Sequence, residues 1–146
     1  MFFSSQYVSE SFDKMPVHDR SPESKRQPIR AIVADDHPVM RQALVSCLLS
    51  LPGVEVVGTA SNGQEALAKS AELKPDLVVA DLLMPVMNGF ELLKALRETY
   101  PAIRLVAVSG HNSSAIATEA VSAGANAFIP KNGLPQDLIH ALEDLL

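Results

Sequence analysis

Residues 75–93 read PDLVVADLLMPVMNGFELL, and this stretch decides the fold. It begins with a short apolar run at residues 77–80, which is followed directly by the carboxylate of Asp81. The pair Asn88-Gly89 is a turn signal, and the apolar residues beyond it recur at helical spacing. A short apolar strand, a loop and an amphipathic helix are the parts of one β-α unit.

The same alternation runs from residue 29 to the end of the chain. Apolar runs predict strands at residues 29–34, 54–59, 77–80, 103–108 and 127–129. The clearest helix follows the first strand, with apolar spacing at Met40, Ala43, Leu44, Cys47, Leu48 and Leu51. Further helices are predicted at about residues 64–73, 90–99, 114–123 and 135–146. Five strands alternating with five helices predict an α/β fold, a (βα)5 doubly wound parallel sheet with helices on both faces.

Composition excludes several classes of protein. The chain has 146 residues, the length of one domain, and is 47% hydrophobic and 20% charged, which excludes disorder throughout. No window approaches the roughly 18 apolar residues of a membrane span, and the N-terminus MFFSSQYVSE lacks the pattern of a secretory signal. The single cysteine, Cys47, excludes an internal disulfide. We therefore expect a soluble, cytoplasmic protein with no membrane partner.

Residues 1–28 differ from the rest of the chain, because they are rich in serine, proline and charge and lack apolar periodicity. This composition predicts a flexible N-terminal tail at residues 1–28 and a folded domain at residues 29–146. The aromatic residues near the start leave open a docking segment for a partner or a true start at Met15. Four basic and four acidic side chains cancel in the tail, so the net charge of −5 lies on the domain. An acidic domain without a basic cluster predicts no direct DNA binding.

Reactive side chains follow four of the five predicted strands. Asp35 and Asp36 follow the first, Asp81 the third, Ser109 the fourth and Lys131 the fifth. The carboxyl ends of parallel strands share one edge of the sheet, where such folds bind ligands. Three carboxylates there repel one another unless a cation neutralises them, and oxygen ligands suit Mg²⁺. With an ammonium and a hydroxyl, they could hold a transferring phosphoryl group, and one carboxylate would become an acyl phosphate. Spacing alone leaves open which carboxylate reacts.

Five segments in order carry a family resemblance. They are IRAIVADDHPVMRQAL at 29–44, VEVVGTASNGQEAL at 54–67, PDLVVADLLMPVMNGFELL at 75–93, IRLVAVSGH at 103–111 and AGANAFIPKNGLPQDL at 123–138. Together they resemble a response-regulator receiver domain of two-component signalling, of the NarL/FixJ-like subfamily. The resemblance covers residues 29–146 and implies the flavodoxin-like strand order 2-1-3-4-5. Its usual LuxR-type helix-turn-helix output domain is not found in these residues, so a stand-alone receiver and the N-terminal part of a transcriptional regulator both stay open.

The resemblance also implies an acceptor and a metal site. Asp81 takes the place of the phosphoacceptor, since it opens the motif D-x-x-M-P-x-M-[DN]-G. Asp36, Asp81 and the backbone carbonyl of Leu83 would ligate Mg²⁺, with Asp35 acting through a water. A sensor histidine kinase or a phosphotransfer protein would supply the phosphoryl group. The chain would then be no enzyme beyond its own aspartyl phosphorylation and dephosphorylation.

Three further residues take places in the switching machinery of that family. Ser109 stands at the switch hydroxyl, Phe128 at the switch aromatic, and Lys131 would pair with the phosphoryl group. Phosphorylation would then shift the domain toward an active form with a changed partner surface, including a surface for a homodimer. Two alternatives remain, a degenerate receiver that acts as a phosphorylation-independent interaction module and an aspartyl phosphatase, which commonly carries an acid where Leu83 stands. We interpret His37 as a loop residue that packs near the site, with a catalytic part as the alternative.

Overall fold

The computed structural model describes residues 27–146, which alternate between strands and helices as predicted. The strands are β1 (Ile29–Ala34), β2 (Val54–Ala60), β3 (Leu77–Asp81), β4 (Arg104–Ser109) and β5 (Ala127–Pro130). The helices are α4 (Pro38–Leu49), α5 (Gly63–Leu73), α6 (Gly89–Thr99), α7 (Ser114–Ser122) and α8 (Gln136–Leu145), with a short 3-10 helix η1 (Lys131–Gly133). The tail predicted at residues 1–28 lies outside the described residues, apart from its last two.

All five strands form one parallel sheet in the order β2-β1-β3-β4-β5, which confirms the predicted fold class and strand order. The register places Ala34 beside Ala80, so β1 and β3 end at nearly the same level. The second and fifth strands lie at the two edges. An edge is where a strand tolerates the charged Glu55 of β2 and where β5 tolerates Pro130 at its end.

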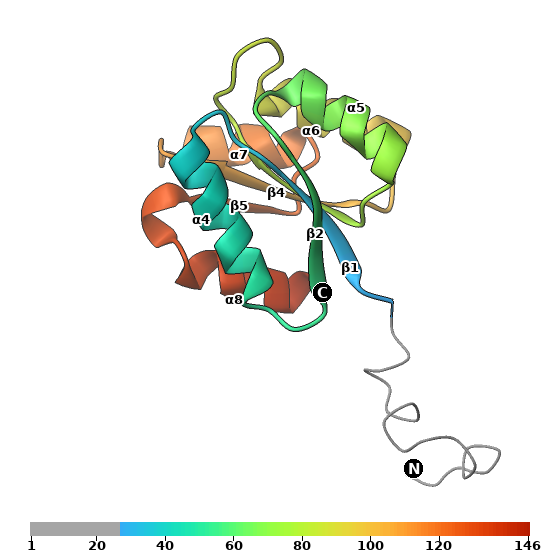
Figure 1. Ribbon diagram of the computed structural model, residues 1–146. Helices are drawn as coiled ribbons and strands as arrows, with labels where there is room; N and C mark the ends of the chain where they lie inside the picture. The colour runs from blue at the N-terminus through green and yellow to red at the C-terminus, as the bar shows by residue number, and fades with distance from the viewer. Residues whose placement is uncertain (1–26) are drawn as a thin grey trace, which may run out of the picture.

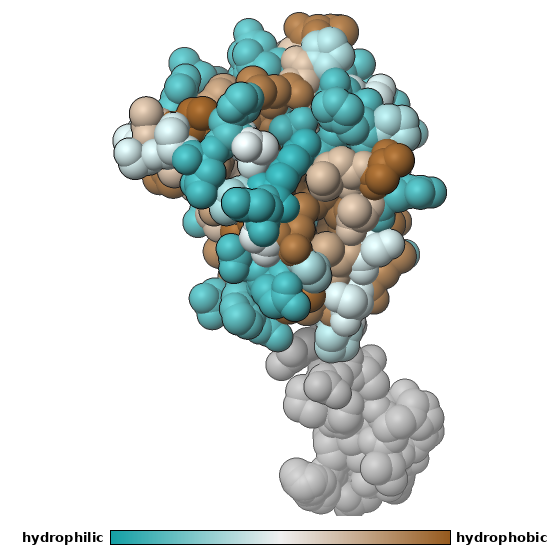
Figure 2. All heavy atoms as spheres, turned by 90° about the vertical axis from the view of Figure 1, so that its left-hand side faces the viewer, coloured by the Kyte–Doolittle hydropathy of each residue, from teal (hydrophilic) through white to brown (hydrophobic). Residues whose placement is uncertain are grey.

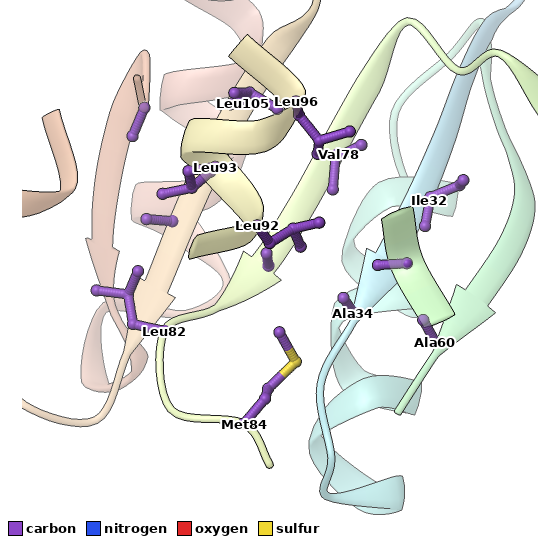
Figure 3. Close-up of a cluster of buried hydrophobic side chains, with 14 of the residues drawn as sticks. Ile32, Ala34, Ala60, Val78, Leu82, Met84, Leu92, Leu93, Leu96 and Leu105 are labelled. Carbon is purple, nitrogen blue, oxygen red and sulfur yellow. The ribbon is translucent and has the colours of Figure 1, made fainter. Parts of the chain in front are cut away.

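Helices cover both faces of the sheet, because successive strand residues point to opposite sides (Figure 1). Ile32 and Val78 face α5, α6 and α7, whose apolar residues complete the first core cluster. Figure 3 shows Leu92, Leu93 and Leu96 of α6 directed into this cluster. The alternate strand residues, such as Val33 and Val79, face α4 and α8 in the second cluster. Helices therefore bury both faces of the sheet, and the ends of the strands remain available for a functional site.

Local signals fix the helix starts near the carboxyl edge of the sheet. Asn62, Asn88 and Ser113 cap α5, α6 and α7 with their side-chain oxygens, and Asn88 forms a reciprocal capping box with Glu91. The last helix differs slightly from the prediction, because Pro135 precedes α8 as its cap residue and the predicted turn at 132–133 lies in η1. Within residues 27–146, no helix has the length and apolar character that crossing a membrane requires.

Candidate functional site

Three carboxylates and one imidazole meet at the carboxyl edge of the sheet. Asp35 and Asp36 directly follow β1, and Asp81 is the last residue of β3, the strand beside it. Asp35 is fully buried and Asp81 is 3% exposed. Together with His37 they each offer a ligand atom, and these atoms all lie within 4.8 Å of one another. The predicted convergence of the two acidic segments is therefore present in the structure.

Lys131 reaches this cluster from the far edge of the sheet. It follows β5, and its Nζ lies 3.3 Å from Oδ2 of Asp35 and 3.4 Å from Oδ2 of Asp81. Because β4 separates β3 from β5, the side chain of Lys131 must cross the end of β4 to make these contacts. With the carboxylates ionised, three negative charges face one ammonium, and the two charges left over are those that a divalent cation would neutralise.

Two carboxylate oxygens of the cluster are left without hydrogen bonds. Among residues 27–146, the buried side-chain oxygens that lack a hydrogen-bond partner are Oδ2 of Asp35 and Oδ1 of Asp36. The ammonium of Lys131 balances the charge of the first oxygen but does not form a hydrogen bond with it. An unsatisfied buried polar group costs about 1–3 kcal/mol, more when charged, so this arrangement fits a site built to hold a hard cation.

The electrostatics single out Asp81. Burial raises the pKa of the Asp81 carboxyl, the nearby ammonium of Lys131 opposes this rise, and the carboxylate of Asp35 adds to it. The backbone N–H of Leu83 donates a hydrogen bond to Oδ1 of Asp81 at 3.3 Å, while Leu83 itself is 53% exposed. Asp81 is therefore a nearly buried carboxylate beside an open loop, held by contacts on both oxygens.

The other two predicted site residues lie on β4 and β5. Ser109 is the last residue of β4 and is 1% exposed, and its Oγ accepts a hydrogen bond from the N–H of His111 at 3.0 Å. Asp81 pairs with Val108 in the sheet register, so Ser109 stands one residue beyond the level of Asp81. Phe128 is half-buried and packs against the cluster beneath α5, α6 and α7. Ser109 thus lies on the strand next to β3, and Phe128 lies on the edge strand beyond it.

His37 lies beside the carboxylates, as predicted for a loop residue that packs near the site. It is the residue before α4, as expected of a loop position near the site, and its side chain is 69% exposed. Its backbone N–H donates to Oδ1 of Asp35 at 2.9 Å. Its Nδ1 lies 3.2 Å from Oδ1 of Asp36, which brings the imidazole into the cluster. The sequence indicates this place of His37 through its position between the acidic pair and Pro38, where the chain must turn sharply into a helix.

The side of the molecule on the left in Figure 1 faces the viewer in Figure 2, which shows hydrophilic and hydrophobic residues interleaved over its surface. Two of the large exposed apolar side chains, Leu83 and Val86, belong to the loop that follows Asp81. Val86 has a positive φ of 70°, an uncommon backbone conformation for a β-branched residue. The loop that follows Asp81 therefore combines exposed apolar groups with local backbone strain.

Comparison with known proteins identifies the family. The model of the response regulator receiver domain family matches residues 31–143. The nitrate/nitrite response regulator NarL of Escherichia coli K12 is 37% identical over 119 residues, which cover 82% of this chain and 55% of NarL. The chemotaxis protein CheY of Thermotoga maritima is 38% identical over 113 residues, which cover 77% of this chain and 93% of CheY. The chain thus spans about half the length of NarL and nearly all of CheY.

Solved structures agree with these sequence matches. A LuxR-family two-component response regulator from Aurantimonas sp. SI85-9A1 has a TM-score of 0.76 at 33% identity, covering 82% of this chain and 85% of that one. The isolated receiver domain of RcsB from Salmonella enterica serovar Typhimurium, solved in the presence of phosphomimetic BeF3⁻, has a TM-score of 0.73 at 27% identity, covering 82% of this chain and 88% of that one. The parallel sheet, the acidic edge and these matches lead to one conclusion: the chain belongs to the response-regulator receiver domain family and is homologous to NarL and CheY.

Proposed function

We propose that this receiver accepts a phosphoryl group on Asp81 from a sensor histidine kinase or a phosphotransfer protein, with Mg²⁺ as cofactor. One observation carries the proposal. Asp81 is nearly buried at the end of β3, and its Oδ2 lies 3.4 Å from the ammonium of Lys131. Asp35 and Asp36 lie close to it, at the end of the neighbouring strand β1. A carboxylate between a cation and further oxygen ligands is suited to phosphoryl transfer.

Phosphoryl transfer to Asp81 would form one bond to phosphorus and break another. A carboxylate oxygen of Asp81 attacks the phosphorus, and the bond from phosphorus to the donor nitrogen breaks as the acyl phosphate forms. The electron pair of the broken bond stays on the donor nitrogen. Lys131, already beside Oδ2 of Asp81, holds its ammonium where the new phosphoryl oxygens would be. Positioning and charge stabilisation of this kind supply most of the catalysis in phosphoryl transfer.

The residues that would hold Mg²⁺ are Asp36, Asp81 and the backbone carbonyl of Leu83, with Asp35 acting through a water. The fit rests on the orphaned oxygens of Asp35 and Asp36 and on the excess of negative charge. When bound, the ion supplies positive charge to the transferring oxygens and neutralises the carboxylates. Asp35, fully buried and 3.3 Å from Lys131, orients the ammonium between itself and Asp81.

Ser109 and Phe128 form the proposed switch. The Oγ of Ser109 accepts one hydrogen bond from His111 and retains its own proton, which it can donate to a phosphoryl oxygen on Asp81. A movement of Ser109 toward the phosphoryl group would leave space for Phe128, which is half-buried one strand away. We expect Ser109→Ala to be phosphorylated on Asp81 but to lose the phosphorylation-dependent change of partner binding. An intact response in that variant would show that the coupling is wrong.

The output of this switch is a changed surface for a partner protein, including a second copy of the chain. The proposal includes a cytoplasmic location, a role in transcriptional regulation, direct action on proteins rather than DNA, and no catalysis beyond the chain's own aspartyl phosphorylation and dephosphorylation. It rests on the resemblance to NarL/FixJ-like proteins and on the acidic charge of the domain. These statements apply to the receiver, since the chain spans about half the length of NarL.

Intact-mass spectrometry after incubation with Mg²⁺ and a small phosphodonor tests the acceptor. We expect one phosphoryl adduct that needs Mg²⁺, is labile as an acyl phosphate, and is absent from Asp81→Ala. Asp144→Ala is the matched control, because Asp144 is an exposed carboxylate on α8 and should leave the adduct unchanged. An adduct that survives in Asp81→Ala, or none in the folded wild type, would contradict the proposal.

A further inference from the structure

We infer that the imidazole of His37 directly ligates a transition-metal ion bound at this cation site, so that Mn²⁺ or Co²⁺ is held through nitrogen as well as oxygen. The inference rests on the proposed function, since it concerns the same cation site, and goes beyond it by adding a ligand and a metal selectivity. It starts from the cluster in which His37 offers one ligand atom together with Asp35, Asp36 and Asp81.

The spacing of the imidazole matches that of two ligands on one ion. Nδ1 of His37 lies 3.2 Å from Oδ1 of Asp36 and 3.5 Å from Oδ1 of Asp35. Adjacent ligands of an octahedral ion with bonds of about 2.1 Å lie about 3.0 Å apart. An imidazole hydrogen bond does not explain the closer contact, because Oδ1 of Asp36 has no hydrogen-bond partner. The nitrogen and the oxygen therefore lie side by side without a donor aimed at an acceptor.

A second observation points independently to a cation. Asp35 is fully buried, and its Oδ2 has no hydrogen-bond partner, although the ammonium of Lys131 is 3.3 Å away. A buried carboxylate oxygen without a donor is costly, and a cation at the cluster would relieve that cost. The cation site is thus indicated by Asp35 as well as by the grouping of acidic residues.

The backbone holds His37 in this place. Its N–H donates to Oδ1 of Asp35 at 2.9 Å, so the residue is tied to the carboxylate that it approaches with its side chain. Pro38 follows at the first position of α4, where its fixed φ restricts how the chain enters the helix. The side chain is 69% exposed, so an ion arriving from water meets the imidazole first and at little desolvation cost.

A nitrogen ligand changes which ions the site favours. Mg²⁺ prefers oxygen ligands and gives up its waters reluctantly, whereas affinity for imidazole rises from Mn²⁺ to Co²⁺ along the first transition row. Loss of a carboxylate would weaken binding of every divalent ion. Loss of the His37 imidazole should instead weaken Co²⁺ and Mn²⁺ binding selectively and leave Mg²⁺ binding nearly unchanged.

The test uses the full chain without an affinity tag and compares the wild type, His37→Ala and His111→Ala. His111 is the matched control, an exposed histidine that follows β4 at the same sheet edge and is not a member of the cluster. Isothermal titration with Mg²⁺ and with Co²⁺ gives the ratio of affinities. We expect the ratio of Co²⁺ affinity to Mg²⁺ affinity to fall about tenfold or more in His37→Ala. Even residues that only hydrogen-bond to a metal ligand change metal affinity about 10- to 100-fold. Pulsed electron paramagnetic resonance of bound Mn²⁺ should show nitrogen modulation in the wild type and His111→Ala but not in His37→Ala.

Equal changes in Mg²⁺ and Co²⁺ affinity, the absence of nitrogen modulation in the wild type, or no divalent binding would each overturn the inference. Failure of the proposed function has a different signature. If His37 ligates Mn²⁺ but Asp81 takes no phosphoryl group with any divalent ion, the inference stands and the phosphoacceptor proposal fails. If Asp81 is phosphorylated with Mg²⁺ and the nitrogen signal is absent, the reverse holds.

Discussion

Replacing Gly89 with alanine should damage both the stability of the fold and the reactivity of Asp81. Gly89 is the first residue of α6, and its N–H donates to the carbonyl of Leu82 at 2.9 Å. A Cβ on Gly89 would lie 2.3 Å from the carbonyl oxygen of Asp81 and 2.6 Å from Cα of Leu82. Both are backbone atoms, so no side chain can rotate away. To reach even the 3.0 Å that is the practical limit for a Cβ contact, the end of β3 must move by about 0.7 Å.

The size of the effect follows from this displacement. Overpacking of a well-packed region costs about 1–3 kcal/mol, and a better helix propensity of alanine offsets at most about 1 kcal/mol of that. A loss of 1 kcal/mol lowers the melting temperature by roughly 4 °C in a domain of this size. Misplacement of a reacting group by about 1 Å can reduce a rate about 100-fold, so we expect phosphorylation of Asp81 to slow by about tenfold or more.

Urea denaturation followed by circular dichroism measures the stability, and intact mass against time measures phosphorylation with a small phosphodonor. Gly110→Ala is the matched control, because Gly110 follows β4 at the same edge and a Cβ there would meet nothing within 4 Å. That variant should stay within about 0.5 kcal/mol of the wild type. Wild-type stability and wild-type phosphorylation in Gly89→Ala would refute the reasoning, as would an equal loss in Gly110→Ala.

Three further predictions concern the charges of the site and the core. Lys131→Ala should lower the free energy of unfolding by about 1–3 kcal/mol, because two buried carboxylates lose their counter-charge, and Mg²⁺ should restore more stability than it adds to the wild type. Equal urea midpoints without Mg²⁺ would contradict this. Mg²⁺ at ten times its Kd should stabilise the wild type by about 1.4 kcal/mol in a thermal melt and should not stabilise Asp36→Asn; an equal shift in both would place the ion elsewhere. Burial raises the pKa of the Cys47 thiol, so the thiolate fraction at a given pH is smaller and alkylation should be slower in the native protein than in urea. Equal alkylation rates would contradict the burial of Cys47.

Much of the fold could be predicted from the sequence, because each strand is short, apolar and bounded by a turn signal. β1 coincides with the predicted strand at residues 29–34, and α5 to α8 begin and end within one residue of their predicted limits. The signal is strong since a parallel sheet buried on both faces demands continuous apolar strands. Each of the other four strands ends one residue later than predicted, which includes Asp81 in β3 and Ser109 in β4. A charged or polar residue ends an apolar run in sequence but can still continue the backbone ladder.

The sequence predicted which residues lie at the candidate site but not the contacts between them. The strand ends predicted that Asp35, Asp81 and Lys131 would share one edge, since that follows from parallel topology. The distances from Lys131 to two carboxylates depend on how η1 leaves the sheet, and no local pattern encodes that exit. The backbone hydrogen bond that ties His37 to Asp35 cannot be read from sequence spacing.

We predict that Asp81, rather than Asp35 or Asp36, carries the phosphoryl group. Reductive trapping tests it most directly, because borohydride converts an aspartyl phosphate to homoserine and leaves free carboxylates unchanged. The phosphorylated wild type is reduced, digested and sequenced by tandem mass spectrometry. We predict homoserine at position 81 in samples that received both Mg²⁺ and phosphodonor, and unmodified aspartate at positions 35 and 36. Homoserine at position 35 or 36, or unmodified aspartate at all three positions despite a mass adduct, would contradict the account.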